Sequence, residues 1–426
     1  MNIAAYSTYD SYKDSGVEWI GEVPAEWHVE PGRQCVYENK YKNTGLKEST
    51  VLSLSYGRVI VKDEDKLTGL VPESFETYQI VQPGDVIIRG TDLQNDMTSL
   101  RTGLAQDKGI ITSAYINLRP KTGIGPAFLH YLLHSYDVKK VFYALGSGLR
   151  QNLSYDDFKY LRLPIPSAVE QRAIAAFLDE KCAKVDEAVR IKEEQIALLR
   201  ERRQILIQEA VTRGLNPAAP MKASGIDWIG ETPEHWEQLA NKHIFKLRKT
   251  LVGKRSSDYD LLSLTLRGII KRDMENPEGK FPAEFDTYQE VSPGDFVFCH
   301  FDVEETPRTV GLSEFFGMIT GAYTVYSVAH GIDPRFLLHF YICADTDKKM
   351  RSLYKGLRNT IPKEAFGAFK TPLPPIEEQR EIVAYIDDAS RKIADAIAIK
   401  QEQIAALKEY KTSLINVAVT GKIKVA

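Results

Sequence analysis

Apolar residues recur with alternating spacings of three and four in two long stretches of the chain, residues 178–210 and 386–418. No Gly or Pro interrupts either stretch, and a seam of this kind is typical of a helix that packs along a second helix. The pattern therefore predicts two long helices that pair with one another. The expected seam residues are Cys182, Val185, Val189, Lys192, Ile196, Leu199, Arg203, Leu206 and Ala210 in the first copy, and Ser390, Ile393, Ile397, Lys400, Ile404, Leu407, Lys411, Leu414 and Ala418 in the second.

Both seams carry cations at matching places. Lys192 and Lys400 are 208 residues apart, as are Arg203 and Lys411. A polar residue in an apolar seam can fix the register of a helix pair at a cost in stability, so we interpret these cations as register devices or docking points. The heptads do not choose between parallel and antiparallel pairing. In the alternative interpretation each helix covers only its own neighbouring domain, because globular helices repeat apolar residues at similar spacing.

The helices belong to a duplication that spans nearly the whole chain. The segment SGVEWIGEVPAEW at 15–27 returns as SGIDWIGETPEHW at 224–236, and these two segments contain all four tryptophans. Large aromatic residues beside a fixed Gly and Pro favour an anchored loop whose rings pack on a core. We expect each of these segments to begin a domain.

Each copy then predicts a β-rich region. Alternating apolar residues at 51–61 and 261–271 are typical of half-buried strands. The Pro-Gly-Asp sequences at 83–85 and 293–295 are turn signals, because Pro fixes φ and Gly accepts the positive φ of a type II turn. A buried strand is expected directly after each turn.

An apolar helix follows in each copy, with Pro126 or Pro334 at its expected first position. We interpret His130, His134 and His339 within these helices as core or rim residues rather than metal ligands. The fold class predicted is therefore α+β, with two similar mixed α/β domains separated by two long helices. The expected boundaries are residues 1–166 and 215–374 for the domains, and 167–214 and 375–426 for the helical regions.

The two copies differ most in one polar loop, at residues 89–103 in the first copy and 300–311 in the second. A variable loop on a repeated scaffold is where two copies of one fold would recognise two different targets. Drift in an unconstrained surface loop is the alternative. Turns at 146–158 and 354–366 share Gly-Leu-Arg and carry nearby side-chain amides.

Composition narrows the class of protein. There are 55 Lys and Arg against 58 Asp and Glu, a net charge of −3, so any bound nucleic acid must be held by local patches rather than by a basic domain. The four cysteines show no metal or CxxC spacing and are expected to be buried thiols in a reducing compartment. The N-terminus does not resemble a signal peptide and no apolar run could span a bilayer, which predicts a soluble, cytoplasmic protein without membrane contact.

Catalytic signatures do not emerge from the sequence. The chain has no Asn/Asp-Pro-Pro-Tyr/Phe motif of amino methylation, no Gly-rich adenosylmethionine turn and no phosphate-binding loop. Glu278, Gly279 and Lys280 superficially match part of a nuclease site, but they lack an Asp at the right spacing. We predict no active site, no metal site and no cofactor in this chain.

The arrangement resembles the specificity subunit of type I restriction-modification systems. The resemblance rests on the Pro-x-Pro stretch that runs into Glu-Gln-Arg at 164–172 and 372–380, on the half-chain repeats, and on the Trp-Ile-Gly-Glu-x-Pro segments. The turn at 151–154, Gln-Asn-Leu-Ser, also fits. The resemblance covers nearly the entire chain, and the order of domain, helix, domain and helix is more specific than any single motif.

This resemblance implies a non-catalytic, DNA-binding subunit. Each half would be a target recognition domain that reads one half of a bipartite, asymmetric site in double-stranded DNA. The long helices would pair as an antiparallel coiled coil with an internal pseudo-twofold repeat, hold the domains apart and dock two methyltransferase (M) subunits. Methylation, translocation and cleavage would belong to the M and restriction (R) subunits, on which S-adenosylmethionine, ATP and Mg are expected.

Base reading in the major groove uses Arg for guanine and Asn or Gln for adenine, and other cations bind phosphates. The loops and turns supply these residue types, and cations at the strand ends are expected to contact phosphates. The candidate DNA-binding residues are Arg89, Gln94, Asn95, Arg101, Arg150, Gln151, Asn152, His300, Arg308, Arg358 and Asn359 for bases, and Arg58, Lys62, Lys271 and Arg272 for phosphates.

The helices would set the spacer between the half-sites. About 36 residues at ~1.5 Å rise make a strut of ~54 Å, and four residues inserted between Lys192 and Arg203 would add ~6 Å, close to two base pairs at ~3.4 Å each. A different class of function, a tandem-repeat coiled-coil scaffold that binds a non-DNA partner, is supported by the slightly acidic halves.

Overall fold

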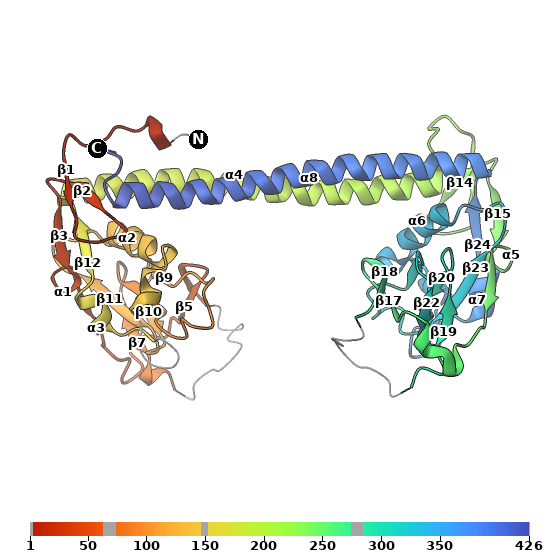
Figure 1. Ribbon diagram of the computed structural model, residues 1–426, viewed down its shortest axis with the longest axis horizontal. Coiled ribbons are helices and arrows are strands. Elements are labelled where there is room, and N and C mark those ends of the chain that lie inside the picture. The colour runs from red at the N-terminus through yellow and green to blue at the C-terminus, as the bar shows by residue number, and fades with distance from the viewer. Residues whose placement is uncertain (1–2, 63–73, 146–151, 274–283, 426) are drawn as a thin grey trace. The chain divides into compact units, whose positions relative to one another are not determined.

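The computed structural model describes residues 3–62, 74–145, 152–273 and 284–425. The chain packs as two compact units: unit 1 contains Met1–Glu193 and Gln401–Ala426, and unit 2 contains Glu194–Lys400. Two long helices, α4 (Ala168–Arg213) and α8 (Ile376–Val419), are each continuous and contribute one part to either unit (Figure 1). Each unit thus combines one β-rich half with segments of both helices.

Unit 1 is built around a four-stranded antiparallel sheet in the order β4-β11-β8-β9. Smaller antiparallel pairs surround it: β1-β2, β12-β3, β5-β6 and β10-β7. The elements are β1 Tyr12–Asp14, β2 Glu22–Pro24, β3 His28–Pro31, α1 Gly32–Cys35, β4 Val36–Glu38, β5 Leu52–Ser55, β6 Arg58–Val61, β7 Gln79–Val81, β8 Val86–Ile88, β9 Thr102–Leu104, β10 Gly109–Ile111, β11 Ile116–Pro120, α2 Pro126–Val138, α3 Tyr155–Lys159 and β12 Arg162–Ile165.

Unit 2 repeats this plan with the sheet β16-β23-β20-β21 and the pairs β13-β14, β15-β24, β17-β18 and β19-β22. The repeated fold predicted from the sequence is therefore confirmed. The elements are β13 Met221–Ala223, β14 Glu231–Pro233, β15 Glu237–Ala240, α5 Asn241–Ile244, β16 Phe245–Arg248, β17 Leu262–Thr265, β18 Gly268–Lys271, β19 Gln289–Val291, β20 Phe296–Phe298, β21 Val310–Leu312, β22 Gly317–Ile319, β23 Thr324–Val328, α6 Pro334–Asp345, α7 Lys363–Ala368 and β24 Lys370–Leu373.

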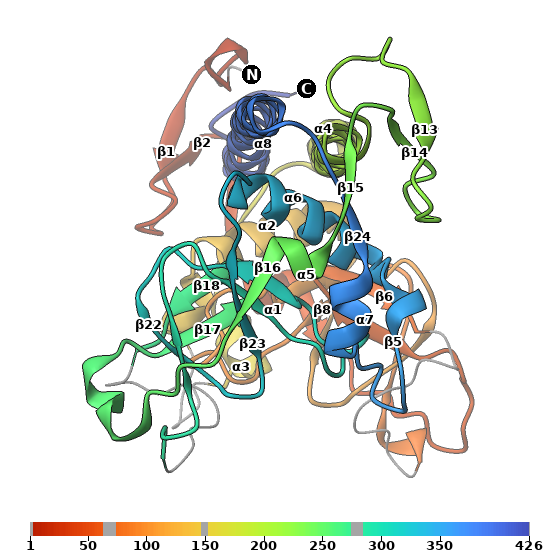
Figure 2. The same ribbon diagram turned by 90° about the vertical axis from the view of Figure 1, so that its right-hand side faces the viewer.

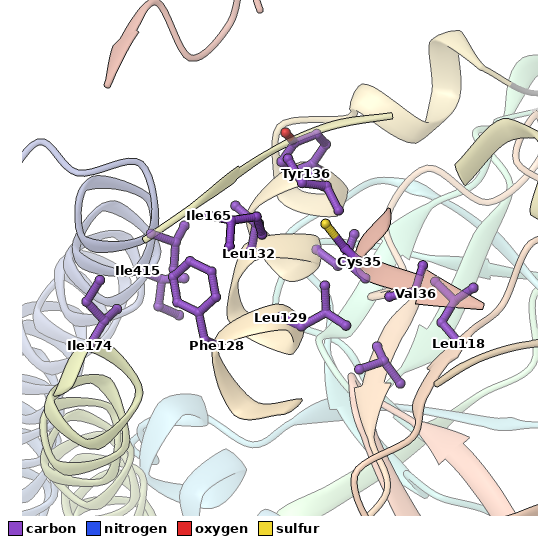
Figure 3. Close-up of a cluster of buried hydrophobic side chains, with 14 of the residues drawn as sticks. Cys35, Val36, Leu118, Phe128, Leu129, Leu132, Tyr136, Ile165, Ile174 and Ile415 are labelled. Atoms are coloured by element: carbon purple, nitrogen blue, oxygen red, sulfur yellow. The ribbon is translucent and has the colours of Figure 1, made fainter. Parts of the chain in front are cut away.

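The core of unit 1 lies on both sides of α2. Leu129 and Leu132 on one side of the helix meet Cys35 and Val36, while Phe128 faces the long helices (Figure 3). Ile174 of α4 and Ile415 of α8 belong to the same buried cluster. All of these side chains are nearly inaccessible to solvent, so the long helices complete the core of this unit.

In unit 2 the corresponding helix, α6, lies between the sheet and the long helices (Figure 2). Its core is richer in aromatic rings: Phe245 contacts Phe296, Phe298 and Tyr341 at ring-centroid distances of 5.4–5.6 Å in edge-to-face arrangements. Such pairs contribute about 0.5–1.5 kcal/mol each beyond burial. The two units thus share an architecture but fill it with different side chains.

The tryptophans anchor the start of each repeat, as predicted. Trp27 and Trp236 are each only 1% exposed. The indole Nε1 of Trp236 donates to Glu378 of α8 at 3.0 Å. Trp19 packs edge-on against Tyr136 of α2 with ring centroids 4.5 Å apart. All four cysteines are buried free thiols, also as predicted.

The helices pair antiparallel within each unit. In unit 1, Asp186 of α4 contacts Lys411 of α8 at 2.7 Å. Lys192, further along α4, contacts Gln403, which comes earlier in α8, also at 2.7 Å. The two helices therefore run in opposite directions. Most predicted seam residues are buried or half-buried. Those that are fully buried are Cys182, Val185, Val189, Ile196, Ala210, Ile393, Ile404, Leu414 and Ala418.

The seam cations behave differently from one another. Lys192 donates to Gln403 and Lys400 donates to Gln195, both at 2.7 Å, so the two lysines make the same contact in their own units. Arg203, by contrast, is exposed, which corrects its assignment to the seam. Lys411, the counterpart of Arg203 in the second copy, pairs with Asp186. The residue equivalent to Asp186 in the second copy is Ala394, which offers Arg203 no carboxylate.

The Glu-Gln-Arg motif acquires a structural explanation. Gln171 is 2% exposed at the start of α4, and its Oε1 accepts from the backbone N–H of Gly125 at 2.7 Å, at the beginning of α2. Its Nε2 donates to the carbonyl oxygen of Pro166 at 2.9 Å. Gln379 makes the equivalent bond to Asp333 N–H at 2.8 Å. One amide therefore links the start of each long helix to the β-rich half beside it.

His130 and His134 lie on α2 with their rings partly covered. Burial lowers the pKa of His130 to about 3 and that of His134 to about 4, so both rings are neutral near pH 7. This agrees with their interpretation as core or rim residues. No helix in the parts of the chain that are described is long and apolar enough to cross a membrane.

Replacing Gln171 or Gln379 with Ala is expected to lower the free energy of unfolding of the corresponding unit by about 1–3 kcal/mol, because buried backbone groups lose their partners. Urea or thermal unfolding of the full chain would measure the loss. Glu402→Ala, on an exposed face of α8, serves as the control and should stay within ~0.5 kcal/mol of the parent. Equal midpoints for all variants would contradict this assignment.

Candidate nucleic-acid interface

The two groups of candidate base-reading residues in unit 2 form one surface. The loop between β20 and β21 lies against the turn before α7: Asp302 N–H donates to the carbonyl oxygen of Arg358 at 2.8 Å, and Ile361 N–H donates to that of His300 at 2.8 Å. The Arg358 Nε also donates to Asp302 Oδ1 at 2.8 Å. We name residues 299–309 together with 354–361 loop pair 2.

Unit 1 has the same arrangement in its described residues. The loop between β8 and β9 meets the segment before α3, where Asp92 N–H donates to Asn152 Oδ1 at 2.9 Å and Leu153 N–H donates to the carbonyl oxygen of Gly90 at 2.7 Å. Residues 89–101 with 152–154 are named loop pair 1. The predicted residues Arg150 and Gln151, like Glu278, Gly279 and Lys280, lie outside the described residues.

Each loop pair is anchored by a buried aspartate at the end of a core helix. Asp137 of α2 accepts from Arg101 N–H at 2.6 Å. Asp345 of α6 accepts from the N–H and the hydroxyl of Thr309, at 3.1 and 2.6 Å. Burial raises the pKa of Asp137 to about 6, because it disfavours the charged form of this carboxyl group. The sequence reasoning missed both residues, although an Asp at the same place in two apolar helices was a usable signal.

Arg101 organises loop pair 1 from inside. It is fully buried, and its guanidinium donates to the carbonyl oxygens of Arg89, Thr91 and Asp92 at 3.2, 2.9 and 3.3 Å. It also donates to that of Asp96, and its Nε donates to Tyr143 Oη at 3.0 Å. In this placement Arg101 supports the loop and does not present its guanidinium to a base.

His300 and Arg308 are also internal supports. The His300 ring is 7% exposed and stacks on Phe298 with centroids 5.4 Å apart. Burial lowers its pKa to about 4, so it is neutral at pH 7. Arg308 is mostly covered and its Nη1 contacts Asp345 Oδ2 at 3.2 Å. Neither side chain extends from the surface as a base contact requires.

The remaining predicted base readers are accessible. Gln94, Asn95 and Asn152 are exposed, and Asn95 donates to Asp92 Oδ1 at 2.7 Å. Arg89 is partly exposed and lies 3.4 Å from Asp96. In loop pair 2, Arg358 is exposed, and the partly exposed Asn359 lies 3.4 Å from Glu305.

The four predicted phosphate contacts lie apart in sequence, on the β5-β6 and β17-β18 hairpins and just after them. Arg58 is 3.4 Å from Asp186 of α4 and remains 73% exposed. Lys271 pairs with Asp260 at 2.5 Å. The backbone N–H groups of Lys62 and Arg272 donate to Val51 and Leu261, each at 2.8 Å. Their role as phosphate contacts stays a prediction.

This chain is similar to known proteins in sequence and in fold. No family model matches the sequence. The putative type I restriction enzyme MjaX specificity subunit of Methanocaldococcus jannaschii is 24% identical over 95% of this chain and 96% of its own length. The type I restriction enzyme MjaVIII specificity subunit of the same organism is 23% identical over 75% of each chain. This chain is therefore similar over nearly its whole length to a type I restriction enzyme specificity subunit.

Solved structures agree with that family at the level of fold. The HsdS subunit from Thermoanaerobacter tengcongensis superposes with a TM-score of 0.52 at 17% identity, over 94% of this chain and 98% of that one. A chain from a structural study of complex assembly and conformational transition of the type I R-M system gives a TM-score of 0.63 at 16% identity, over 93% and 98%. The predicted fold is therefore confirmed.

We expect Arg101→Met to loosen loop pair 1, because the backbone carbonyls of residues 89–96 lose their shared donor. Backbone amides of residues 89–101 should exchange with deuterium at least tenfold faster, which mass spectrometry of the full chain would measure. Arg89→Met removes a partly exposed arginine from the same loop with only one 3.4 Å ion pair and should exchange nearly as the parent does. Equal protection in the two variants would show that Arg101 is not the organiser.

Proposed function

We propose that this chain is the DNA-recognition subunit of a type I restriction-modification complex, with each unit reading one half of a bipartite, asymmetric site. One observation supports this most strongly. Loop pairs 1 and 2 occupy the same place in the repeated framework, between the third and fourth strands of the central sheet order and next to the end of a core helix, yet their exposed residues differ. Two copies of one framework that carry different exposed residues are suited to bind the two unlike halves of an asymmetric target.

Catalysis in this proposal belongs to partner subunits. The relatives are named specificity subunits, which favours a non-catalytic role over an independent enzyme. Two M subunits would dock on the helix pair and supply S-adenosylmethionine chemistry, and R subunits would supply ATP- and Mg-dependent translocation and cleavage. The relatives' names also favour DNA recognition over a scaffold that binds a non-DNA partner.

The charge of the chain defines how DNA would be bound. With a net charge of −3, the isolated chain lacks the broad positive field that concentrates DNA. Affinity in the complex would therefore draw on the M subunits, while the loop pairs contribute discrimination. The proposal must therefore be tested with the assembled complex and not with the isolated chain.

The test is to co-express the chain with its M subunits and map methylated adenines by sequencing. The expected result is one bipartite motif with two unlike half-sites and a spacer of fixed length. Binding of the complex to this motif should weaken as salt rises. Methylation without sequence preference, or at a single continuous motif, would contradict the proposal.

Lengthening both helices should lengthen only the spacer. We would insert one heptad between Glu193 and Glu194 and another between Gln401 and Glu402, which keeps Lys192 with Gln403 and Gln195 with Lys400. Seven residues at ~1.5 Å rise add ~10 Å, or about three base pairs. The mapped half-sites should stay unchanged.

The control for this insertion is seven Gly and Ser residues placed after Asn216, in the exposed link after α4. That change alters the chain length without altering the helix pair, so the mapped spacer should match the parent. A longer spacer in the control, or altered half-sites with an unaltered spacer in the heptad variant, would refute the role of the helices in spacing.

A further inference from the structure

The turn at the tip of loop pair 2 has a fixed backbone. Lys355 and Thr360 bridge its base, with N–H···O distances of 2.8 and 3.1 Å in the two directions. Between them Gly356 and Asn359 adopt positive φ of 72° and 43°, and Asn359 N–H donates to the carbonyl oxygen of Gly356 at 3.3 Å. The side chain of Arg358 therefore leaves the backbone at a defined point.

The guanidinium of Arg358 is held on two sides. Its Nε donates to Asp302 Oδ1 at 2.8 Å and its Nη2 donates to Asp302 Oδ2, which makes a two-point ion pair. Its carbon Cζ lies 5.4 Å from the ring centroid of Phe301, whose ring stacks with Tyr323. A two-point pair fixes the plane of a guanidinium, and an aromatic face restricts its remaining tilt.

Arg358 nevertheless stays accessible. Its side chain is 67% exposed, against 35% for Asp302. An exposed arginine usually loses much rotamer freedom when it binds, but here the surroundings have already restricted it. Two other accessible arginines of the candidate set lack a two-point pair: Arg58 makes a single 3.4 Å contact with Asp186, and Arg89 makes a single 3.4 Å contact with Asp96.

The geometry leaves one edge of the guanidinium available. Asp302 takes the edge formed by Nε and one N–H of Nη2, so the second N–H of Nη2 and the N–H groups of Nη1 point away from it. Two parallel donors of this kind match the O6 and N7 acceptors of guanine in the major groove. A carboxylate that fixes one edge thus prepares the opposite edge for a base.

We propose that Arg358 reads a guanine in the half-site of unit 2 and that Asp302 is its positioning residue. This inference rests on the proposed function. Asp302 contacts no DNA in this arrangement, so its removal should weaken the guanine contact without changing which base is preferred. Arg358 determines the base itself.

The first experiment is methylation mapping with the assembled complex carrying Arg358→Gln, Asp302→Asn or Arg335→Gln. Arg358→Gln should lose the preference for guanine at one position of one half-site, and the other half-site should remain unchanged as an internal reference. Asp302→Asn should keep guanine at that position with a methylation rate reduced about three- to tenfold. Arg335 lies outside the loop pair and donates from Nη2 to both carboxylate oxygens of Asp387, and its variant should retain the full motif.

A second experiment removes the acceptor from the DNA instead of the donor from the protein. An oligonucleotide with 7-deazaguanine at that position lacks the N7 atom. It should weaken binding by the parent complex about tenfold or more, and it should have little further effect on binding by the Arg358→Gln complex. Binding losses that simply multiply would show that Arg358 does not contact this base.

The outcomes separate this inference from the proposed function. If the parent complex methylates no bipartite motif, the proposed function fails. If the motif is bipartite but Arg358→Gln leaves both half-sites intact and weakens binding to all sequences alike, Arg358 is a phosphate contact and the inference is overturned. A parent motif without guanine in either half-site would overturn it as well.

Discussion

The packing of α2 and α6 on the long helices is the interaction on which the other features of this chain depend. Phe128 contributes to the cluster that contains Ile174 and Ile415, while the same helix carries Asp137 at its other end. The aspartate in turn holds the end of loop pair 1. One short helix therefore connects the part proposed to set distance with the part proposed to read bases, and α6 repeats this connection through Asp345. A loss of apolar contact at the helix would be transmitted to the loop.

Much of this architecture follows from the sequence because it depends on local patterns. Heptad spacing identified the long helices, and Pro-Gly-Asp marked the turns before the buried strands β8 and β20. The 208-residue repeat identified equivalent positions. The contact between Lys192 and Gln403 is repeated by Lys400 and Gln195, so both copies of the repeat encode the same contact between the helices.

The loops were less predictable, because their residue types do not reveal which side chains turn inward. Arg101 and Arg358 are both arginines in polar loops, yet one is fully buried and the other is mostly exposed. The difference comes from partners that are distant in sequence: Arg101 donates to Tyr143, and Arg358 donates to Asp302. Similarly, Lys411 pairs with Asp186, whereas Ala394 stands at the equivalent position of the second repeat and offers Arg203 no acid. Tertiary contacts decide these cases, and single-sequence patterns do not contain them.

Ion pairing within loop pair 2 also explains why net charge was a poor guide to function. Arg358 pairs with Asp302, and Arg351, which precedes the second segment of loop pair 2, pairs with Glu304, so cations on this surface are matched by acids. Such a surface attracts DNA weakly at long range but presents donors and acceptors in fixed positions. In the proposed function, this surface would discriminate between bases after another surface has brought the duplex close.

The buried guanidinium of Arg101 has one more consequence, which concerns evolution. Its hydrogen bonds inside the loop go to main-chain carbonyl oxygens, and its one side-chain acceptor, Tyr143, lies outside the loop. Every residue offers such a carbonyl, so mutations in the exposed side chains of residues 90–96 can change the surface of the loop while its support persists, and in the proposed function this would change what the loop recognises. The loop can acquire new targets without a matching change in the protein beneath it.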